Sequence, residues 1–274
     1  MAEGIRRLGD KPRLIDGDYA GVVDADVAVF YGFQPNVRRV MRDYVLANKH
    51  AIHIDLGYWS RRFRGSRYGY HRFSINSHHP TDYFQRVKHP QDRADALGIT
   101  LETWKHGGSH ILLCGMSEKA AGVVGFTYQQ WERDAVVKIQ KATERPIWYR
   151  PKAVKGHNYP RINGTQLNEP CAIFDSKGYP ISDISRALSN AWCVVSHHSN
   201  AGIDAVISGV PCFQVDGVAL PMGLADFSKI ETPKEPTIDE RRQWVNDVAY
   251  TQFNCEEMRA GVPWRHFKDE GLIG

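Results

Sequence analysis

The sequence lacks the signatures of several large protein classes. No apolar run approaches the roughly 18 residues that a transmembrane helix needs, and the start, MAEGIRRLGDKPRL, has no apolar segment typical of a secretory signal. The GxxxxGK[ST] motif of P-loop kinases and the GxGxxG motif of dinucleotide-binding enzymes are both absent, as are Cys-x-x-Cys and His-Glu-x-x-His. These absences argue against a membrane protein, a P-loop kinase and an NAD-dependent enzyme, and we expect a cytoplasmic protein.

Cysteine is also scarce. The chain has five cysteines, an odd number: Cys114, Cys171, Cys193, Cys212 and Cys255. Four of the five lie beside apolar residues. This pattern favours reduced core thiols over disulfides. With 274 residues and 42% hydrophobic residues, the chain is long enough for two linked halves of about 130 residues each. We place the boundary between residues 1–145 and residues 146–274.

Short apolar runs alternate with helical spacing along the chain. Five segments carry the pattern: a strand over Val27–Tyr31, a helix over Val37–Ala47, and strands over Ala51–Ile54, Ile111–Cys114 and Pro146–Arg150. A further helix is predicted from about Tyr128 to Ala142. Strand, helix and strand with short connections imply parallel pairing, so we predict an α/β fold with doubly wound sheets.

The segment Trp192–Val215, WCVVSHHSNAGIDAVISGVPCFQV, combines two predicted strands with a helix over residues 201–208. Small and polar residues fill the turn before the helix: Ser196, His197, His198, Ser199 and Asn200. A helix N-terminus presents unpaired N–H groups that bind phosphate, and Ser199 and Asn200 can cap it. Asp204, one turn further on, can accept hydrogen bonds from the hydroxyls of a ribose. An ordinary strand-helix-strand unit with a capped helix has the same pattern.

The pattern Ser-Asn-x-x-x-Asp-Ala-x-x-x-Gly-x-Pro from Ser199 to Pro211 resembles the donor-binding half of GT-B glycosyltransferases. The similarity is to the capsular-polysaccharide and Kdo-transferase-like group and to the related enzymes encoded by bacteriophages. It extends to Arg150-Pro151-Lys152 and to the C-terminal end, in a set of residues that look like the group's closing helices: Arg241, Trp244, Ala249–Phe253, Glu256-Glu257 and Gly261–Trp264.

This resemblance implies a GT-B-like fold, in which two Rossmann-like halves enclose an active site in the cleft between them. Residues 1–145 would then hold the acceptor, and residues 146–274 would bind the nucleotide sugar and carry the closing helices. A UDP-sugar is the expected donor, with no other cofactor. The residues implied in donor binding are Arg150, Lys152, Ser196, His198, Ser199, Asn200, Ala201 and Asp204.

Asp55 is the first candidate catalytic residue, because it follows the apolar strand HAIHI and is expected at a carboxyl end. An inverting glycosyltransferase needs a general base within reach of the acceptor hydroxyl, and a carboxylate can serve. Asp55 can instead cap a turn or pair with an arginine of the loop that follows. His197 is the second candidate, although its position beside the donor site also suits hydrogen bonding to phosphate or stabilisation of the leaving group.

Arginines and aromatic residues alternate directly after Asp55, in WSRRFRGSRYGYHRF from Trp59 to Phe73, and no acidic residue occurs between Asp55 and Asp82. Arginine binds phosphates and aromatic rings stack on bases, so this loop is a candidate DNA-binding element. The residues assigned to it are Trp59, Arg61, Arg62, Phe63, Arg64, Arg67 and Tyr70. A solvated surface loop, or a site for a phosphorylated or lipid-linked acceptor, explains the same composition.

No metal site is predicted. Gly107 and Gly108 separate His106 from His110, and Asp24-Ala25-Asp26 precedes a strand where a metal-binding Asp-x-Asp would follow one.

Taken together, the resemblance and the basic loop predict a glycosyltransferase that acts on 5-hydroxymethylpyrimidine bases in phage DNA, within the host cytoplasm if a phage encodes it. The alternatives are a capsular-polysaccharide sugar transferase and an α/β protein that binds a nucleotide or nucleic acid without catalysis.

Overall fold

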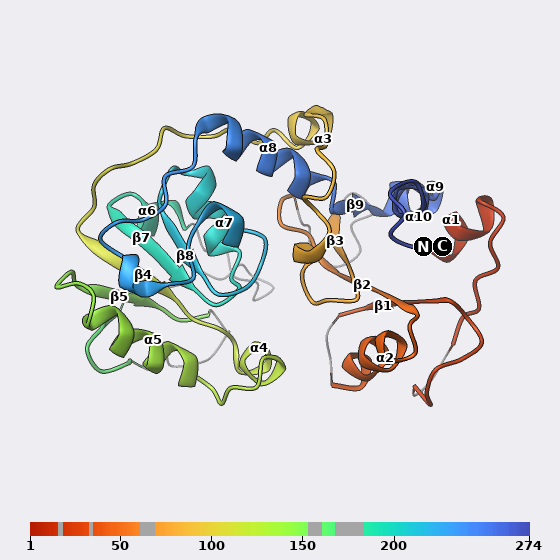
Figure 1. Ribbon diagram of the computed structural model, residues 1–274, viewed down its shortest axis with the longest axis horizontal. Helices are drawn as coiled ribbons and strands as arrows, with labels where there is room; N and C mark the ends of the chain where they lie inside the picture. Colours follow the sequence, from red (N-terminus) through yellow and green to blue (C-terminus); the bar gives the residue numbers. More distant parts are fainter. Residues whose placement is uncertain (16–18, 33–34, 61–68, 153–160, 168–183) are drawn as a thin grey trace, which may run out of the picture. The chain divides into compact units, whose positions relative to one another are not determined.

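A computed structural model describes the chain except for residues 16–18, 33–34, 61–68, 153–160 and 168–183 (Figure 1). Its contacts divide the chain into two compact units. Unit 1 contains residues Met1–Ile99 and Gln243–Gly274, and unit 2 contains Thr100–Arg242. The boundary predicted at residue 145 therefore lies inside unit 2, and the C-terminal segment belongs with the N-terminal residues.

Unit 2 is built on a parallel sheet of five strands in the order β6-β5-β4-β7-β8 (Figure 1). The strands are β4 (His110–Cys114), β5 (Ile147–Arg150), β6 (Gln166–Leu167), β7 (Ala191–Ser196) and β8 (Cys212–Gln214). The chain enters at the centre, fills one side of the sheet, and returns to fill the other side. This is the order of a Rossmann-type sheet. The doubly wound prediction is confirmed for this unit.

The helices of unit 2 are α4 (Glu118–Val123), α5 (Gln130–Gln140), α6 (Ser185–Leu188) and α7 (Ala201–Ile207), with short helices η2 (Leu220–Met222) and η3 (Phe227–Lys229). Ile111 and Leu113 of β4 share one face of the sheet, because side chains alternate along a strand. They form a core with Trp131 and Ile139 of α5, and all four are buried. The continuous apolar runs seen in the sequence are thus explained by burial on both faces of a parallel sheet.

Unit 1 contains a mixed sheet in the order β1-β2-β3-β9, with strands β1 (Val27–Tyr31), β2 (His50–Leu56), β3 (Tyr70–Ile75) and β9 (Gln252–Asn254). Only β1 and β2 are parallel, because β3 pairs antiparallel with both β2 and β9. The prediction of a doubly wound N-terminal half is therefore wrong beyond β2. Strand β3 pairs antiparallel with β2, from Ile52 opposite Ile75 to Leu56 opposite His71, which a doubly wound parallel sheet does not contain.

The helices of unit 1 are α1 (Ala2–Arg7), α2 (Pro35–Leu46), α3 (Asp92–Ala96), α9 (Cys255–Ala260) and α10 (Val262–Asp269), with the short helix η1 (Pro80–Asp82). Helix α8 (Ile238–Ala249) includes the boundary between the units. Phe73 of β3 and Phe253 of β9 pack edge-on, with ring centroids 5.4 Å apart, and both contact Phe267 of α10. The C-terminal helices thus complete the core of unit 1.

Two predictions of composition can be compared with the structure. Cys114, Cys193, Cys212 and Cys255 are free thiols, and the first three are buried, whereas Cys171 lies outside the described residues. No helix within the described part of the chain has both the length and the apolar composition needed to cross a membrane.

Candidate functional site

The candidate donor site lies at the carboxyl ends of β4, β5 and β7. Strand order reverses between β4 and β7, and the register aligns Cys114 of β4 with Arg150 on one side and Ser196 on the other. Ligands of open α/β sheets bind at this kind of switch point, outside the carboxyl ends of the strands. The structure therefore brings two predicted donor residues, Arg150 and Ser196, to the expected edge of the sheet.

Charged side chains from two segments lie near this edge. Burial raises the pKa of the Cys114 thiol to about 12, while Arg150 and Lys152 act in the opposite direction and Asp204 in the same direction. All three are therefore close enough to influence one buried thiol. Arg150 is buried, Lys152 is exposed and Asp204 is partly exposed. The site thus combines two cations with one carboxylate, the charges expected of a site for a diphosphate and a ribose.

Gln214 fixes the loop that follows β7, a role that the sequence did not reveal. Its Nε2 donates to Ser196 Oγ at 3.1 Å and to the Ser199 carbonyl at 2.9 Å, and its Oε1 accepts from the Ala219 N–H. Gly202 leaves the necessary room, since a Cβ there would lie 2.7 Å from Gln214 Nε2. One buried amide therefore holds both ends of the predicted phosphate loop.

Capping of α7 differs in part from the prediction. Ser199 Oγ accepts from the Ala201 N–H at 3.2 Å, as expected of a residue near the start of a helix. Asn200 occupies the N-cap position, but its side chain makes no capping hydrogen bond, so its predicted capping role is wrong. Ala201, the first residue of α7, is buried.

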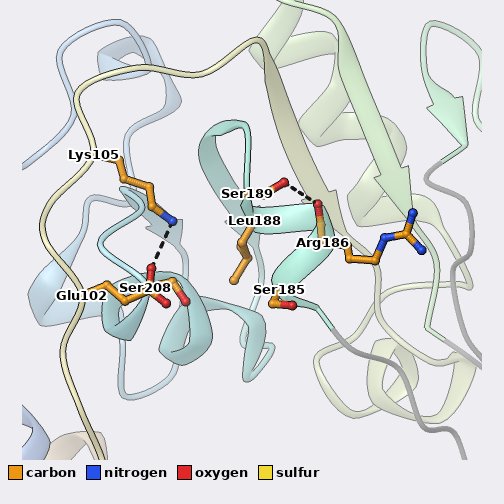
Figure 2. A pocket seen from close by; sticks show the side chains of 7 residues that line it. All are labelled: Glu102, Lys105, Ser185, Arg186, Leu188, Ser189 and Ser208. Atoms are coloured by element: carbon orange, nitrogen blue, oxygen red, sulfur yellow. Dashed lines mark hydrogen bonds and ion pairs between the residues drawn. The ribbon is translucent and has the colours of Figure 1, made fainter.

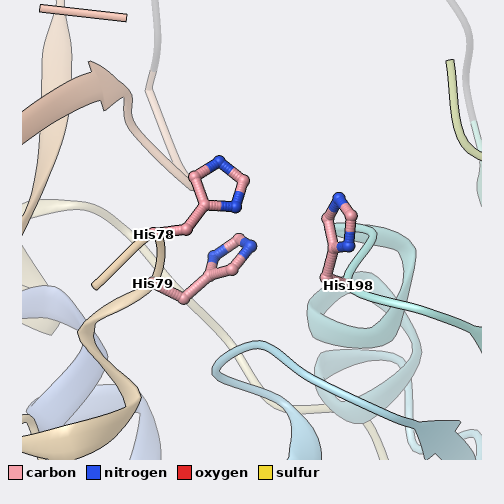
Figure 3. A group of neighbouring side chains, drawn as sticks. All are labelled: His78, His79 and His198. Atoms are coloured by element: carbon pink, nitrogen blue, oxygen red, sulfur yellow. The ribbon is translucent and has the colours of Figure 1, made fainter. Parts of the chain in front are cut away.

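The two histidines of the loop have different surroundings. His197 is buried and lies edge-on to Trp131 and Phe126, with ring centroids 5.5 and 6.0 Å away. Burial lowers the pKa of His197, which keeps the ring neutral at pH 7. Its Nδ1 is 2.8 Å from Nδ1 of His198. His198 is half-buried and precedes the first turn of α7 (Figure 3). The catalytic role of His197 therefore stays a prediction.

Asp55 lies at the carboxyl end of β2 in unit 1, as predicted, and it forms an ion pair. Its Oδ2 is 3.3 Å from Nη2 of Arg72, and its Oδ1 accepts from the Leu56 N–H. Arg72 also donates to the His78 carbonyl at 2.7 Å and lies 2.8 Å from His79 Nδ1. The rings of His78 and His79 are neighbours, with centroids 4.4 Å apart (Figure 3). The alternative in which Asp55 pairs with an arginine is thus realised, with the arginine on β3.

The predicted DNA-binding loop is shorter than its composition suggested. Tyr70 begins β3 and pairs with Asn254, and Arg72 and Phe73 are buried in the sheet. Trp59 is partly buried and lies edge-on to Trp244, with ring centroids 6.5 Å apart. The other assigned residues, Arg61, Arg62, Phe63, Arg64 and Arg67, lie outside the described residues. Both described ends are therefore anchored in unit 1, and a DNA-binding role of Trp59 and Tyr70 stays a prediction.

Unit 2 has a hollow of about 520 Å³ away from the candidate donor site (Figure 2). It is lined by Glu102, Lys105, Ser185, Arg186, Leu188, Ser189 and Ser208. Leu188 and Ser189 precede β7, and Ser208 ends α7, so this hollow is at the amino ends of the strands. None of the predicted donor residues lines it, and ligands of parallel sheets bind at the opposite edge.

The comparisons with known proteins identify no family. No family model and no curated protein matches the chain. One similar solved structure is the Thermosulfurimonas dismutans KpsC, described as a beta Kdo 2,4 transferase. The similarity covers 82% of this chain and 80% of that chain, with 11% identity and a TM-score of 0.43. A similarity at this level carries no argument, so the site must be judged on its own geometry.

Proposed function

We propose that unit 2 binds a nucleotide sugar at the carboxyl ends of β4 and β7, and that the protein transfers the sugar to a hydroxyl acceptor. One observation carries this proposal: the sheet order β6-β5-β4-β7-β8 reverses at β4, where Cys114 lies between Arg150 and Ser196 and its thiol senses the charges of Lys152 and Asp204. A Rossmann-type sheet with this order binds nucleotides at the same position.

The chemistry of each residue fits one part of the donor. The Arg150 guanidinium and the Lys152 ammonium supply positive charge for the diphosphate, since charge-assisted hydrogen bonds to phosphate are the strong ones. Ser199 and His198 lie on the loop fixed by Gln214 and supply polar groups near the same edge. Asp204 supplies an acceptor for the ribose hydroxyls. A UDP-sugar remains our proposed donor.

Calorimetry with UDP tests the donor site. Arg150→Ala should weaken UDP binding by about 1.5–3 kcal/mol, the range for a hydrogen bond to a charged group. Arg242→Ala is the matched control, because Arg242 is an exposed residue that pairs only with Asp239 three positions away among the described residues. Unchanged UDP affinity in a folded Arg150→Ala variant would remove Arg150 from the site.

Slow donor hydrolysis separates a transferase from a binding protein. A glycosyltransferase incubated with a panel of nucleotide sugars should release free nucleoside diphosphate from one of them, whereas a protein that only binds the nucleotide releases none. Release from no member of a broad panel would favour the binding protein.

The identity of the acceptor is a more specific proposal, and it rests on the sequence alone. The arginine-aromatic composition of residues 59–73 favours DNA containing 5-hydroxymethylpyrimidines over a capsular saccharide. A hydroxymethylated oligonucleotide is incubated with the protein and the intact nucleotide sugar that the protein hydrolyses slowly. Mass spectrometry of the oligonucleotide should then show the added mass of one sugar. Transfer to a saccharide acceptor but not to the oligonucleotide would favour the capsular alternative.

A further inference from the structure

Unit 1 contains a cluster of metal-ligating side chains that the proposed function does not use. His89 precedes α3, His266 lies on α10, and Glu270 follows α10 directly. His89 Nε2 is 2.7 Å from Glu270 Oε1, and His266 Nδ1 is 3.6 Å from the same oxygen. Two imidazole nitrogens and one carboxylate oxygen lie within 4.8 Å of one another. We propose that His89, His266 and Glu270 bind a divalent transition-metal ion, with zinc as the best candidate.

The ligand set and the chain geometry both suit zinc. Two histidines and one carboxylate form a set that zinc accepts, with a water molecule in the fourth position. His266 and Glu270 are four residues apart, so they project from the same side of one helical turn. His89 comes from a distant part of the chain, which means that a bound ion would tie the segment before α3 to the C-terminal helix.

Asp247 of α8 orients His89 in the way that carboxylates orient metal-binding histidines. Its Oδ1 lies 3.1 Å from His89 Nδ1 and accepts from the His89 backbone N–H at 3.0 Å. Gln243 Nε2 also donates to this oxygen, at 2.9 Å. A proton on Nδ1, shared with Asp247, leaves the lone pair of Nε2 for a metal ion, and such outer contacts are typical of metal sites.

Aromatic packing restricts both imidazole rings. His89 stacks on Tyr250, with ring centroids 4.5 Å apart and an interplanar angle of 24°. His266 lies 5.6 Å from the ring of Phe253 and 5.7 Å from that of Tyr250. Side chains that are already held in place lose little conformational entropy on binding an ion, so the site is preorganised.

The local charge also favours a cation. Asp247 and Glu270 contribute two carboxylates, and the nearby Arg93 guanidinium is engaged by both carboxylate oxygens of Glu257. The competing account is that a protonated His89 alone bridges the two carboxylates. Burial lowers the pKa of His89, but the hydrogen bonds to Asp247 and Glu270 outweigh it and raise the pKa to about 9. A metal ion must displace this proton, so binding of zinc decides between the two accounts.

The test uses the full chain, stripped with EDTA, dialysed and titrated with zinc chloride by calorimetry. We expect one specific site. His266→Gln and Glu270→Gln should each weaken zinc binding at least tenfold, and Asp247→Asn should weaken it by about 10–100-fold, the usual effect of losing an outer-shell partner. His106→Gln is the matched control, because His106 forms an exposed pair with Glu235 at 3.3 Å and should leave zinc affinity unchanged.

Thermal unfolding gives an independent result. Zinc should raise the Tm of the wild-type protein and of His106→Gln by mass action, and should not raise the Tm of Glu270→Gln. If His266→Gln fails to fold, Glu270→Gln and the visible absorption of bound Co²⁺ in the wild type still test the site. Absence of zinc binding by the stripped wild type, or a zinc affinity of both ligand variants equal to that of the wild type, would overturn the proposal and leave His89 as a bridging cation.

Discussion

Asp55 and Arg72 form an ion pair in which the arginine is the more buried partner. The side chains are 32% and 8% exposed respectively, and their closest atoms are 3.3 Å apart. Arg72 has further contacts with the His78 carbonyl and with His79. Because a buried guanidinium is costly without its partners, Asp55 must be replaced by a residue that still accepts a hydrogen bond.

Asp55→Asn meets this requirement and tests the proposed general base. The asparagine keeps an acceptor for Arg72 but cannot take a proton, so turnover should fall by about 10²-fold or more with donor affinity little changed. Steady-state kinetics and UDP calorimetry measure the two effects. Asp43→Asn is the control, since Asp43 pairs with the exposed Arg42 on α2. Turnover near that of the control would redirect attention to His197 and His198.

Asp204 allows the ribose to be tested separately from the diphosphate. Asp204→Ala should weaken the binding of UDP and leave inorganic pyrophosphate binding nearly intact, because only the ribose hydroxyls lose their acceptor. Paired calorimetric titrations with the two ligands measure this difference. Equal losses for both would assign Asp204 to support of α7.

Specific partners of single residues could be predicted where they are close in sequence. Ser199 caps the helix that begins two residues later, and the spacing alone showed this. The partner of Asp55 is 17 residues away, on a strand whose antiparallel register places Arg72 directly opposite. The role of Gln214 depends on the neighbouring strand in the same way, because Ser196 and Gln214 are register partners. Such contacts require knowledge of strand pairing.

At the scale of elements, Arg241 of α8 stabilises the C-terminal end of α7. Its guanidinium donates to the carbonyl of Val206 through two nitrogens, at 3.0 and 2.6 Å, and to the carbonyls of Ile207 and Glu102. The last carbonyls of a helix have no partner within the helix, so a buried cation supplies the missing donors. Arg241 is 1% exposed and its guanidinium lies above the Trp104 ring.

Arg241→Ala should therefore destabilise the protein by on the order of 3 kcal/mol, since several buried carbonyls lose their donors together. Chemical denaturation measures the change, and Arg242→Ala, the exposed neighbour, should change stability by less than about 0.5 kcal/mol. If Arg241→Ala loses no more stability than Arg242→Ala, water must replace the guanidinium as the donor to these carbonyls.

Elements could be predicted where apolar residues are continuous. The predicted strands at Val27–Tyr31, Ile111–Cys114 and Pro146–Arg150 match β1, β4 and β5 within one residue at each end. Strand β3, YHRFSI, lies largely within the segment predicted as a DNA-binding loop, because arginine and histidine interrupt its apolar residues. Strand β9 has only three residues and pairs with β3, which is far away in sequence. Their formation depends on tertiary contacts, which local pattern does not reveal.

At the scale of the whole molecule, the chain crosses from one unit to the other twice, and this explains why the predicted boundary differs from the structure. Strand β4 belongs with β5 and β7 in unit 2. From the sequence alone, residues 100–145 are equally consistent with the end of the N-terminal half. The C-terminal residues add β9 to the sheet of unit 1 and the helix α10 to its core. Composition is similar on both sides of each crossing, so only the pairing of the strands locates it.

The DNA hypothesis makes a prediction at the same scale, because any footprint on DNA must be local when the net charge is only +4. Replacing Arg61, Arg62 and Arg64 together with alanine should weaken DNA binding and flatten its salt dependence. Each lost phosphate contact reduces the slope by about 0.9 for duplex DNA and about 0.7 for a single strand. UDP binding should be unchanged, because none of the residues assigned to donor binding belongs to this loop.

Fluorescence anisotropy over a range of salt concentrations measures that slope. The matched control replaces Arg6, Arg7 and Arg259, three arginines on helices α1 and α9 that remove the same charge from another part of unit 1. If the loop binds DNA, only the first triple variant lowers the slope, and it also lowers transfer to a hydroxymethylated oligonucleotide. Equal slopes for the two variants and the parent would assign the basic loop to a saccharide or lipid-linked acceptor, since neither acceptor releases the counterions of a nucleic acid on binding.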